Sequence, residues 1–258
     1  MFSIIQFLKY LIRSFHLHGI HSPFIFDLND KVIQANLPYY SFDAIESIRA
    51  KLLLTNKEIE VLDLGAGSKK GNKQKRKINE IAKSAVKKPK YAQLIFRLVY
   101  EFKPKTIVEL GTSFGITTAY MAHAASNSKI YTLEGSPEIA KVAKINFEKL
   151  NIKNINQIVG NFNDALPELL KKTETLDFVY FDGNHQEKPT IDYFQLCLEK
   201  ANENSVFIFD DIYWSKGMIM AWEFIKKHPK VTVSIDLFQI GIVFFKQDQE
   251  KQNFTIYH

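Results

Sequence analysis

The stretch "IVELGTSFGITTAY", from Ile107 to Tyr120, decides the fold. Its first half is an apolar run typical of a buried parallel strand, and its second half has the composition of a helix. Gly111 and Gly115 lie between the two halves, where the chain has to turn sharply. A strand, a glycine turn and a helix in this order indicate a ligand loop, because free backbone N–H groups at the start of the helix face the ligand.

A second stretch, "VLDLGAGSKKG" from Val61 to Gly71, has more glycines but is the weaker candidate. A loop that binds a ribose needs an acidic residue at the end of the next strand. The segment "KIYTLE" ends in Glu134, 23 residues after Gly111, whereas the second stretch continues into "NKQKRK". We therefore interpret residues 111–115 as the ligand loop. The glycines of the second stretch, Gly65 and Gly67, are interpreted as turn residues.

From residue 91 the chain alternates between strand and helix patterns. The helix after "IYTLE" is expected to have Ser136 at its N-cap. Alternation of this kind predicts an α/β fold, a Rossmann-like doubly wound sheet that is mostly parallel. The pattern contains seven strands. The last two, "VTVSIDLF" and "GIVFFK", are too close in sequence for a parallel crossover, so they form a C-terminal antiparallel hairpin.

Residues 1–90 do not alternate in this way and predict an N-terminal, mainly helical cap or interface extension, with residues 91–258 as the ligand-binding domain. The segment 69–90 has ten Lys and Arg residues and one acid, so its net charge is +9 and that of the remaining chain is −3. Such a run is able to hold nucleic acid. Since no aromatic residues separate the lysines, we expect a solvated linker and helix face instead.

The cysteine content and the lengths of the apolar runs favour a cytoplasmic protein. The only cysteine, Cys197, lies in an apolar helical context and is expected to be a buried structural thiol. No apolar run reaches the roughly 18 residues of a membrane span. The start of the chain, "MFSIIQFLKYLIRSFH", indicates an amphipathic helix that we expect to pack on the domain or on a second copy in a homodimer.

The sequence of the loop also reduces the number of candidate ligands. Glu134 suits the ribose diol of either NAD or S-adenosylmethionine, and so does not choose between them. A pyrophosphate favours the spacing G-x-G-x-x-G, whereas this loop has G-x-x-x-G. The hydroxyls of Thr112 and Ser113 and the carboxylate of Glu109 suit the amino-acid end of S-adenosylmethionine, which has no phosphate.

On these residues the chain resembles class I S-adenosylmethionine-dependent methyltransferases. It is most similar to the catechol and caffeoyl-CoA type O-methyltransferases and their uncharacterised bacterial relatives. The resemblance covers about residues 91–245 and rests on "VELGTSFGITTAYMA", "IYTLEGSPE", "VGNFNDALPEL", "DFVYFDGNH" and "FIFDDIYW". It implies a cofactor site made of the methionine loop, the ribose acid with its two following residues, the adenine turn and one aspartate. These residues are Glu109, Gly111, Thr112, Ser113, Gly115, Glu134, Gly135, Ser136, Gly160, Asn161, Phe162 and Asp182.

The resemblance also implies a catalytic centre. Metal-dependent members have one Asp after the fourth strand and an Asp-Asn pair after the fifth, and this chain has Asp182, Asp210 and Asp211 as candidate ligands of Mg²⁺. Asp211 departs from that pattern. Three residues after Asp182, where the catechol enzymes have a catalytic lysine, this chain has His185. We assign His185 and Asp182 as catalytic residues, because an imidazole is able to accept a hydroxyl proton near neutral pH.

The function predicted from the sequence is therefore O-methylation of a small-molecule hydroxyl. One alternative is a nucleic-acid methyltransferase that uses segment 69–90, although the strand end "YFDGNH" lacks the turn of amine-directed enzymes. Others are a non-catalytic module that binds S-adenosylmethionine and an NAD-dependent reductase. For the acceptor the sequence offers only candidates, which are His18, His21, Tyr213 and Trp214.

Overall fold

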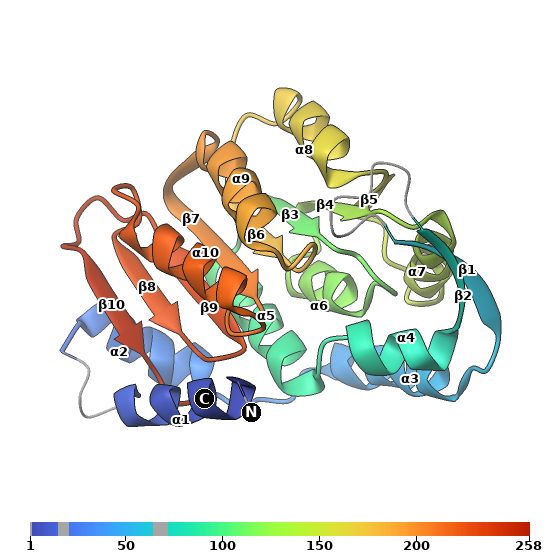
Figure 1. Ribbon diagram of the computed structural model, residues 1–258, viewed down its shortest axis with the longest axis horizontal. Helices are drawn as coiled ribbons and strands as arrows, with labels where there is room; N and C mark the ends of the chain where they lie inside the picture. The colour runs from blue at the N-terminus through green and yellow to red at the C-terminus, as the bar shows by residue number, and fades with distance from the viewer. Residues whose placement is uncertain (1, 15–20, 64–71) are drawn as a thin grey trace. The chain divides into compact units, whose positions relative to one another are not determined.

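The computed structural model describes residues 2–14, 21–63 and 72–258 (Figure 1). These residues form two compact units. Unit 1 contains the N-terminal part up to residue 35 and residues 170–258, and unit 2 contains residues 36–169. The division into a cap of residues 1–90 and a domain of residues 91–258 stays a prediction.

Unit 2 has three parallel strands, β3 (Thr106–Leu110), β4 (Lys129–Glu134) and β5 (Ile155–Val159), in the order β3-β4-β5. Two helices connect them, α6 (Ile116–Ala124) and α7 (Pro137–Lys149), and α8 (Phe162–Lys171) follows β5. The strands are parallel, so all three end at the same edge of the sheet. The ligand loop and the two turns that follow β4 and β5 therefore lie side by side.

The N-terminal part of unit 2 is mainly helical, as predicted, and also contains a hairpin. Helix α3 (Tyr40–Leu54) is followed by an antiparallel hairpin of β1 (Glu58–Asp63) and β2 (Asn72–Lys77), and then by α4 (Ile78–Ala85) and α5 (Pro89–Phe102). Residues 72–77 of the basic segment are thus a strand and not a linker. Its register pairs Glu58 with Lys77 and Glu60 with Lys75, and opposite charges across a ladder stabilise the pairing. The glycines at 65 and 67 lie outside the described residues.

One hydrophobic cluster joins this N-terminal part to the ligand loop. Its members come from α3, β1, α4, α5 and α6, together with Phe114 of the loop and Ile139 of α7. The rings of Phe42, Phe96 and Tyr120 pack in edge-to-face contacts with centroids 5.0–6.4 Å apart. Residues 40–85 therefore help to build the core under the loop.

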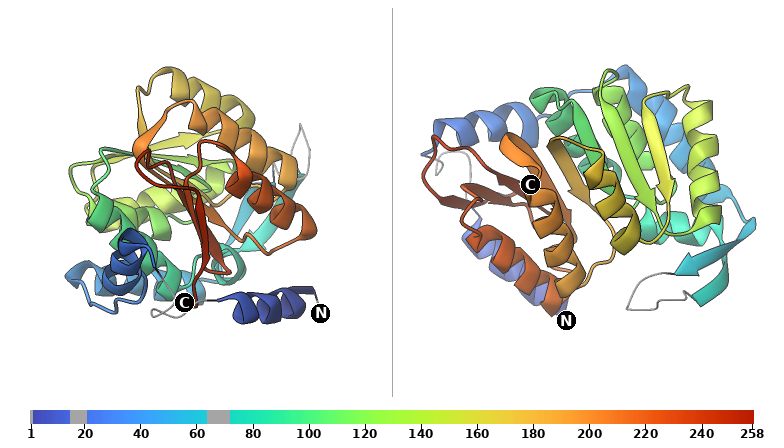
Figure 2. Two further views of the ribbon diagram at one scale, coloured as in Figure 1. Left: turned by 90° about the vertical axis from the view of Figure 1, so that its left-hand side faces the viewer. Right: turned by 90° about the horizontal axis from the view of Figure 1, so that it is seen from above.

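Unit 1 has five strands in the order β10-β8-β9-β7-β6: β6 (Leu176–Phe181), β7 (Ala201–Asp210), β8 (Val233–Asp236), β9 (Ile240–Phe244) and β10 (Gln252–Thr255). Strand β9 is antiparallel to both β7 and β8, which confirms the predicted C-terminal hairpin. The other two pairings are parallel. Helices α9 (Glu187–Leu198) and α10 (Lys216–Lys227) lie side by side (Figure 2).

The predicted mostly parallel α/β fold is confirmed, but the described strands outside the β1–β2 hairpin number eight and not seven. The additional strand, β10, was missed because "QNFT" has one large apolar side chain and no clear alternation. It is accompanied by α1 (Phe2–Arg13), α2 (Pro23–Leu28) and a π-helical turn (Asn29–Ile33). The Tyr10 hydroxyl donates a hydrogen bond of 2.5 Å to the Ile256 carbonyl, and so fixes α1 beside the end of β10. None of the described helices is long and apolar enough to cross a membrane.

The contact between β9 and α10 gives a test of this packing. A Cβ atom on Gly241 would lie 2.6 Å from Trp222 Cη2, and Trp222 is almost fully buried. We expect Gly241→Ala to lower the free energy of unfolding by roughly 1–3 kcal/mol, because a well-packed core does not accept an added methyl group. The measurement is urea unfolding followed by circular dichroism.

The matched control is Gly217→Ala in the first turn of α10. Its Cβ would be 3.3 Å from the Glu187 Cβ, a contact that a small shift relieves. Alanine also favours a helix over glycine. Equal stability of the two variants would contradict the packing of Trp222 on β9.

Candidate functional site

The loop after β3 is a tight turn set by two glycines. Gly111 has a φ of 106° and Gly115 a φ of 76°, values that residues with a side chain rarely adopt. The N–H groups of Gly111 and Thr112 donate to the Leu133 carbonyl at 3.0 and 3.1 Å, and the Gly115 N–H donates to the Thr112 carbonyl at 2.8 Å. Gly115 is the N-cap of α6, so the loop leads directly into a helix N-terminus.

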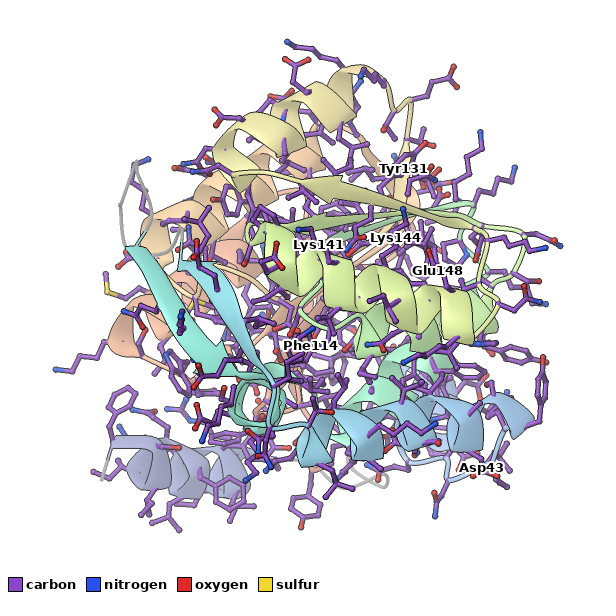
Figure 3. The ribbon with its side chains drawn as sticks, turned by 90° about the vertical axis from the view of Figure 1, so that its right-hand side faces the viewer. Asp43, Phe114, Tyr131, Lys141, Lys144 and Glu148 are labelled. Carbon is purple, nitrogen blue, oxygen red and sulfur yellow. The ribbon has the colours of Figure 1, made fainter. Side chains whose placement is uncertain are left out.

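Helix α7 packs against this loop. Asn146 Nδ2 donates to the Phe114 carbonyl at 3.0 Å, and both residues are buried. The Phe147 ring lies against Gly115 so closely that a Cβ there would be 2.3 Å from the ring. The opposite face of α7 carries exposed charged residues, among them Lys141, Lys144 and Glu148 (Figure 3). Asn146 and Phe147 therefore position the loop, and the alternation of strands and helices gave no signal for their role.

Glu109, at the end of β3, is fully buried in a network of hydroxyl groups. Its Oε2 accepts hydrogen bonds from Thr118 Oγ1 of α6 and, at 2.6 Å, from Thr132 Oγ1 of β4. Thr132 uses its proton for Glu109, so Thr112 Oγ1 donates to Thr132 Oγ1, at 2.6 Å. Burial raises the pKa of Glu109 to about 8, although the two hydroxyl donors oppose this rise.

Two buried polar atoms at this loop have no hydrogen-bond partner among the described residues. They are Glu109 Oε1 and Ser113 Oγ. Buried polar atoms are nearly always paired, and an unpaired one costs about 1–3 kcal/mol. Both atoms belong to residues that the resemblance assigns to the methionine end of the cofactor. Both are therefore available for a hydrogen bond to a bound ligand.

Glu134 closes β4 and contacts the loop directly. The N–H of Ser113 donates to its Oε2 and the N–H of Ser136 donates to its Oε1, each at 2.9 Å. Burial raises the pKa of Glu134, and its hydrogen bonds from backbone N–H groups lower it in part. A carboxylate has about four lone-pair sites, so one held at both oxygens still has room for two hydroxyl donors. This geometry suits a ribose diol.

Ser136 stands at the N-cap of α7, as the sequence predicts, but its hydroxyl does not cap the helix. Instead, Ser136 Oγ accepts the N–H of Leu62 in β1 at 3.1 Å. The β1–β2 hairpin is thereby attached to Ser136, two residues after Glu134. Sequence reasoning missed this contact because the two residues are 74 positions apart.

The turn after β5 lies at the same edge as the loop and Glu134. The Gly160 N–H donates to the Glu134 carbonyl at 3.0 Å, and Asn161 Oδ1 accepts the N–H of Asn163 at 2.9 Å. The half-buried Phe162 begins α8. The structure thus brings together all the predicted cofactor residues that belong to unit 2, and their contact with a cofactor stays a prediction.

In unit 1 a second group of predicted residues follows β6 and β7. Their parallel register pairs Phe181 with Phe209, so Asp182, directly after β6, and Asp210, the last residue of β7, lie at the same edge of neighbouring strands. His185 Nε2 lies 3.9 Å from Asp182 Oδ1 and 4.0 Å from Asp211 Oδ2. Asp182 Oδ2 also accepts the Tyr180 hydroxyl at 3.0 Å.

The metal prediction rests on Asp182, Asp210 and Asp211. Mg²⁺ requires several oxygen ligands in near-octahedral geometry. Within the described ranges, no group of three or more His, Cys, Asp or Glu side chains is arranged to hold a metal ion. The described arrangement therefore does not fit a preformed three-carboxylate site, and the mechanism below uses no metal.

The acceptor candidates have different surroundings. Tyr213 donates to Asp236 Oδ2 at 2.6 Å and stacks on Phe238 with ring centroids 5.1 Å apart, so both its hydroxyl and one ring face are in use. Trp214 is 70% exposed and His21 is exposed. The histidine at 18 lies outside the described residues. Cys197 is fully buried and burial raises the pKa of its thiol, which agrees with the structural role expected for it.

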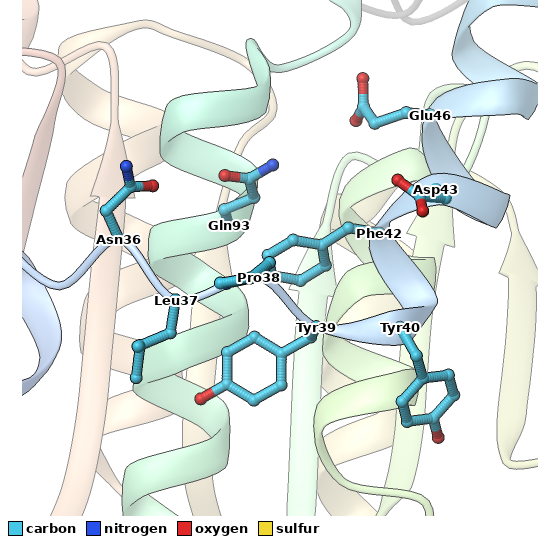
Figure 4. A pocket seen from close by; sticks show the side chains of 9 residues that line it. All are labelled: Asn36, Leu37, Pro38, Tyr39, Tyr40, Phe42, Asp43, Glu46 and Gln93. Atoms are coloured by element: carbon cyan, nitrogen blue, oxygen red, sulfur yellow. The ribbon is translucent and has the colours of Figure 1, made fainter.

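Unit 2 also has an open pocket of about 540 Å³ that involves none of the predicted site residues (Figure 4). Its lining comes from residues 36–40, from α3 and from α5, and includes Asp43, Glu46 and Gln93. The carboxylate of Glu46 accepts hydrogen bonds from Arg49 Nε at 2.8 Å and from the Tyr120 hydroxyl at 2.8 Å. The charge of Glu46 is therefore already paired within the unit.

Comparison with known proteins finds similarity to methyltransferases. Residues 108–212 match a family model described as "Methyltransferase domain". The chain is 31% identical over 126 residues to a catechol O-methyltransferase of Niastella koreensis, a match that covers 48% of this chain and 55% of the relative. It is 26% identical over 117 residues to a catechol O-methyltransferase of Mycobacterium tuberculosis, with 45% and 51% covered. The chain thus spans about half the length of the curated relatives it matches.

Solved structures show the same fold. An O-methyltransferase from Bacillus cereus, determined in complex with S-adenosylhomocysteine (SAH), superposes with a TM-score of 0.58 at 19% identity. The superposition covers 84% of this chain and 94% of that chain. The resemblance to methyltransferases of the catechol type, stated from the motifs, is confirmed.

The raised pKa of Glu109 predicts how stability depends on pH. Its folded-state pKa of about 8 lies above its ordinary value of 4.5. The carboxyl group therefore contributes its full stability below pH ~4.5 and loses it as the pH rises through ~8. We expect Glu109→Gln, which mimics the neutral acid, to gain roughly 2–4 kcal/mol on the wild type between pH ~5 and ~9.

The measurement is urea unfolding of both ligand-free proteins over this pH range. The difference between them isolates Glu109 from the other titrating groups. Asp164→Asn, on the exposed first turn of α8, is the control and should keep a constant difference from the wild type. A constant difference for Glu109→Gln as well would mean that Glu109 is ionised in the folded protein.

Proposed function

We propose that the protein is an S-adenosylmethionine-dependent methyltransferase that methylates a hydroxyl group of a small molecule. The observation that carries the proposal is the Glu134 carboxylate, which accepts hydrogen bonds from the N–H of Ser113 in the ligand loop and from the N–H of Ser136, two residues after β4. A carboxylate held in this way beside a glycine turn supports binding of a ribose diol, and the spacing of that turn differs from G-x-G-x-x-G, which a pyrophosphate favours. The match of residues 108–212 to a methyltransferase domain supports it.

The residues of unit 2 suit each part of the cofactor. Glu109 Oε1 would accept a hydrogen bond from the ammonium group of the methionine end. Ser113 Oγ would form a hydrogen bond to the same end. Glu134 would hold the ribose hydroxyls, and the turn of Gly160 and Asn161 would border the adenine. When bound, the cofactor supplies a methyl group on a positively charged sulfur, which makes the methyl carbon electrophilic.

The acceptor hydroxyl has to lose its proton as it attacks the methyl carbon. We assign this task to His185 Nε2, which takes the proton as a general base. Asp182 Oδ1 and Asp211 Oδ2 lie 3.9 and 4.0 Å from that nitrogen. Because methyl transfer needs an in-line approach, orientation of the acceptor accounts for much of the remaining acceleration.

The alternative of a nucleic-acid methyltransferase receives less support. Two lysines of the basic strand β2 stand opposite Glu58 and Glu60, which lowers the positive potential available to a phosphate backbone.

Since the only cysteine is a buried thiol that needs no oxidising compartment, the cytoplasm is the localisation that we propose.

The first test is binding of SAH, measured by calorimetry. We expect Glu134→Ala to weaken binding by roughly 10²-fold, because two charge-assisted hydrogen bonds contribute about 3 kcal/mol or more. The control is Glu138→Ala, since Glu138 pairs with Lys141 on the surface of α7 and should leave the affinity unchanged. Unchanged affinity in Glu134→Ala would exclude the proposed cofactor site.

The second test concerns catalysis. With 1,2-dihydroxybenzene as the probe acceptor, we expect His185→Gln to lower kcat by roughly 10²–10⁴-fold while SAH affinity stays the same. His228→Gln, at the C-cap of α10, is the matched control and should keep full activity. The product is identified by mass spectrometry as the acceptor plus one methylene unit.

Two further outcomes separate the alternatives. A wild-type protein that binds SAH but methylates none of a panel of phenols and alcohols would favour the non-catalytic module. Loss of activity with a chelator and recovery with Mg²⁺ would show that Asp182, Asp210 and Asp211 act as metal ligands, and would transfer part of the role of His185 to the ion.

A further inference from the structure

Helix α1 leaves an apolar stripe uncovered. Five aliphatic residues on successive turns are exposed: Ile4 (64%), Ile5 (46%), Leu8 (54%), Leu11 (38%) and Ile12 (86%). At 100° per residue they occupy one continuous arc of the helix, and no charged residue interrupts it. Large contiguous apolar patches of this kind mark sites of interaction.

The stripe is not the face by which α1 joins its own unit. The docked face is formed by Phe7 and Tyr10, whose rings lie 5.0 and 5.3 Å from that of Phe238. The Tyr10 hydroxyl donates to the Ile256 carbonyl and accepts the N–H of His258 at 3.2 Å. Helix α1 is therefore already anchored, and its aliphatic stripe faces away from these contacts.

A second copy of the chain is a poor occupant of the stripe. Twelve residues of helix are about 18 Å long and about 10 Å wide, so one face offers roughly 180 Å² per copy. Stable interfaces between proteins bury about 800 Å² per partner. The helix has no acidic residue to pair with Lys9 and Arg13 of another copy. Two α1 helices face to face would bring like charges together.

A bilayer surface suits the same features. Lys9 and Arg13 lie beside the stripe, where they would reach anionic headgroups while the aliphatic side chains enter the acyl boundary. An amphipathic helix with aliphatic residues on one side and basic residues next to them is typical of interfacial binding. We propose that α1 is a membrane-surface anchor that attaches the protein to anionic lipid. This occupant differs from the second copy that the sequence favoured.

The test is co-sedimentation of the full chain with vesicles of phosphatidylcholine alone or with about 30% phosphatidylglycerol. We expect binding to the anionic vesicles, weaker at high salt, and at least ~10-fold less binding to the neutral ones. Leu8→Asp with Ile12→Asp should abolish binding. Lys9→Gln with Arg13→Gln should weaken it by roughly 5-fold for each charge removed.

The matched control is Ile145→Asp, because Ile145 is 48% exposed on α7 and lies outside the stripe. This variant should bind vesicles like the wild type, and all variants should keep their helical circular dichroism and SAH affinity. Wild-type protein that stays in solution with anionic vesicles would overturn the proposal. So would light scattering that finds a dimer which Leu8→Asp with Ile12→Asp converts to monomer, since the stripe would then bind a second copy.

Discussion

The carboxyl group of Glu109 is the constraint on which the rest of unit 2 depends. It is fully buried at the end of β3, and its hydrogen bonds reach Thr132 of the next strand and Thr118 of the helix that follows the loop. A buried carboxyl without such partners would cost several kcal/mol. The network therefore fixes the strand end, its neighbour and the helix start in one arrangement, and the glycine turn between them has little freedom left.

The N-terminal part of unit 2 adds a second layer of support to that loop. Tyr120 of α6 donates its hydroxyl to Glu46 of α3, and burial together with this contact keeps the tyrosine protonated by raising its pKa. Glu46 is in turn held by Arg49. With the bond from Leu62 to Ser136, these contacts connect α3 and the β1–β2 hairpin to both sides of the loop. A segment that reads as an added cap thus takes part in positioning the ligand site.

The sequence predicted the parts of the molecule that repeat a strong local pattern. The parallel strands are short apolar runs, and their succession along the chain followed from the alternation with helices. Strands β2 and β10 were missed because their residues are mostly polar and their stability comes from ladder partners elsewhere in the chain. The same reason applies to Asn146, Phe147 and Leu62, which act on the loop through contacts between distant residues. The charges around His185 were predicted only as separate residues, and the structure adds the distances that join them.

Glu109 of β3 and Glu134 of β4 are two acids beside one loop, and they have different physical roles. Glu134 receives backbone N–H groups at both oxygens, so its charge is compensated by fixed dipoles before any ligand arrives. Glu109 has only hydroxyl donors on one oxygen, and a pKa of about 8 keeps it largely neutral near pH 7. A ligand ammonium group beside Oε1 would reverse that preference, because a nearby cation stabilises the carboxylate. Binding of an amino-acid end at this position is then coupled to the loss of one proton from the protein.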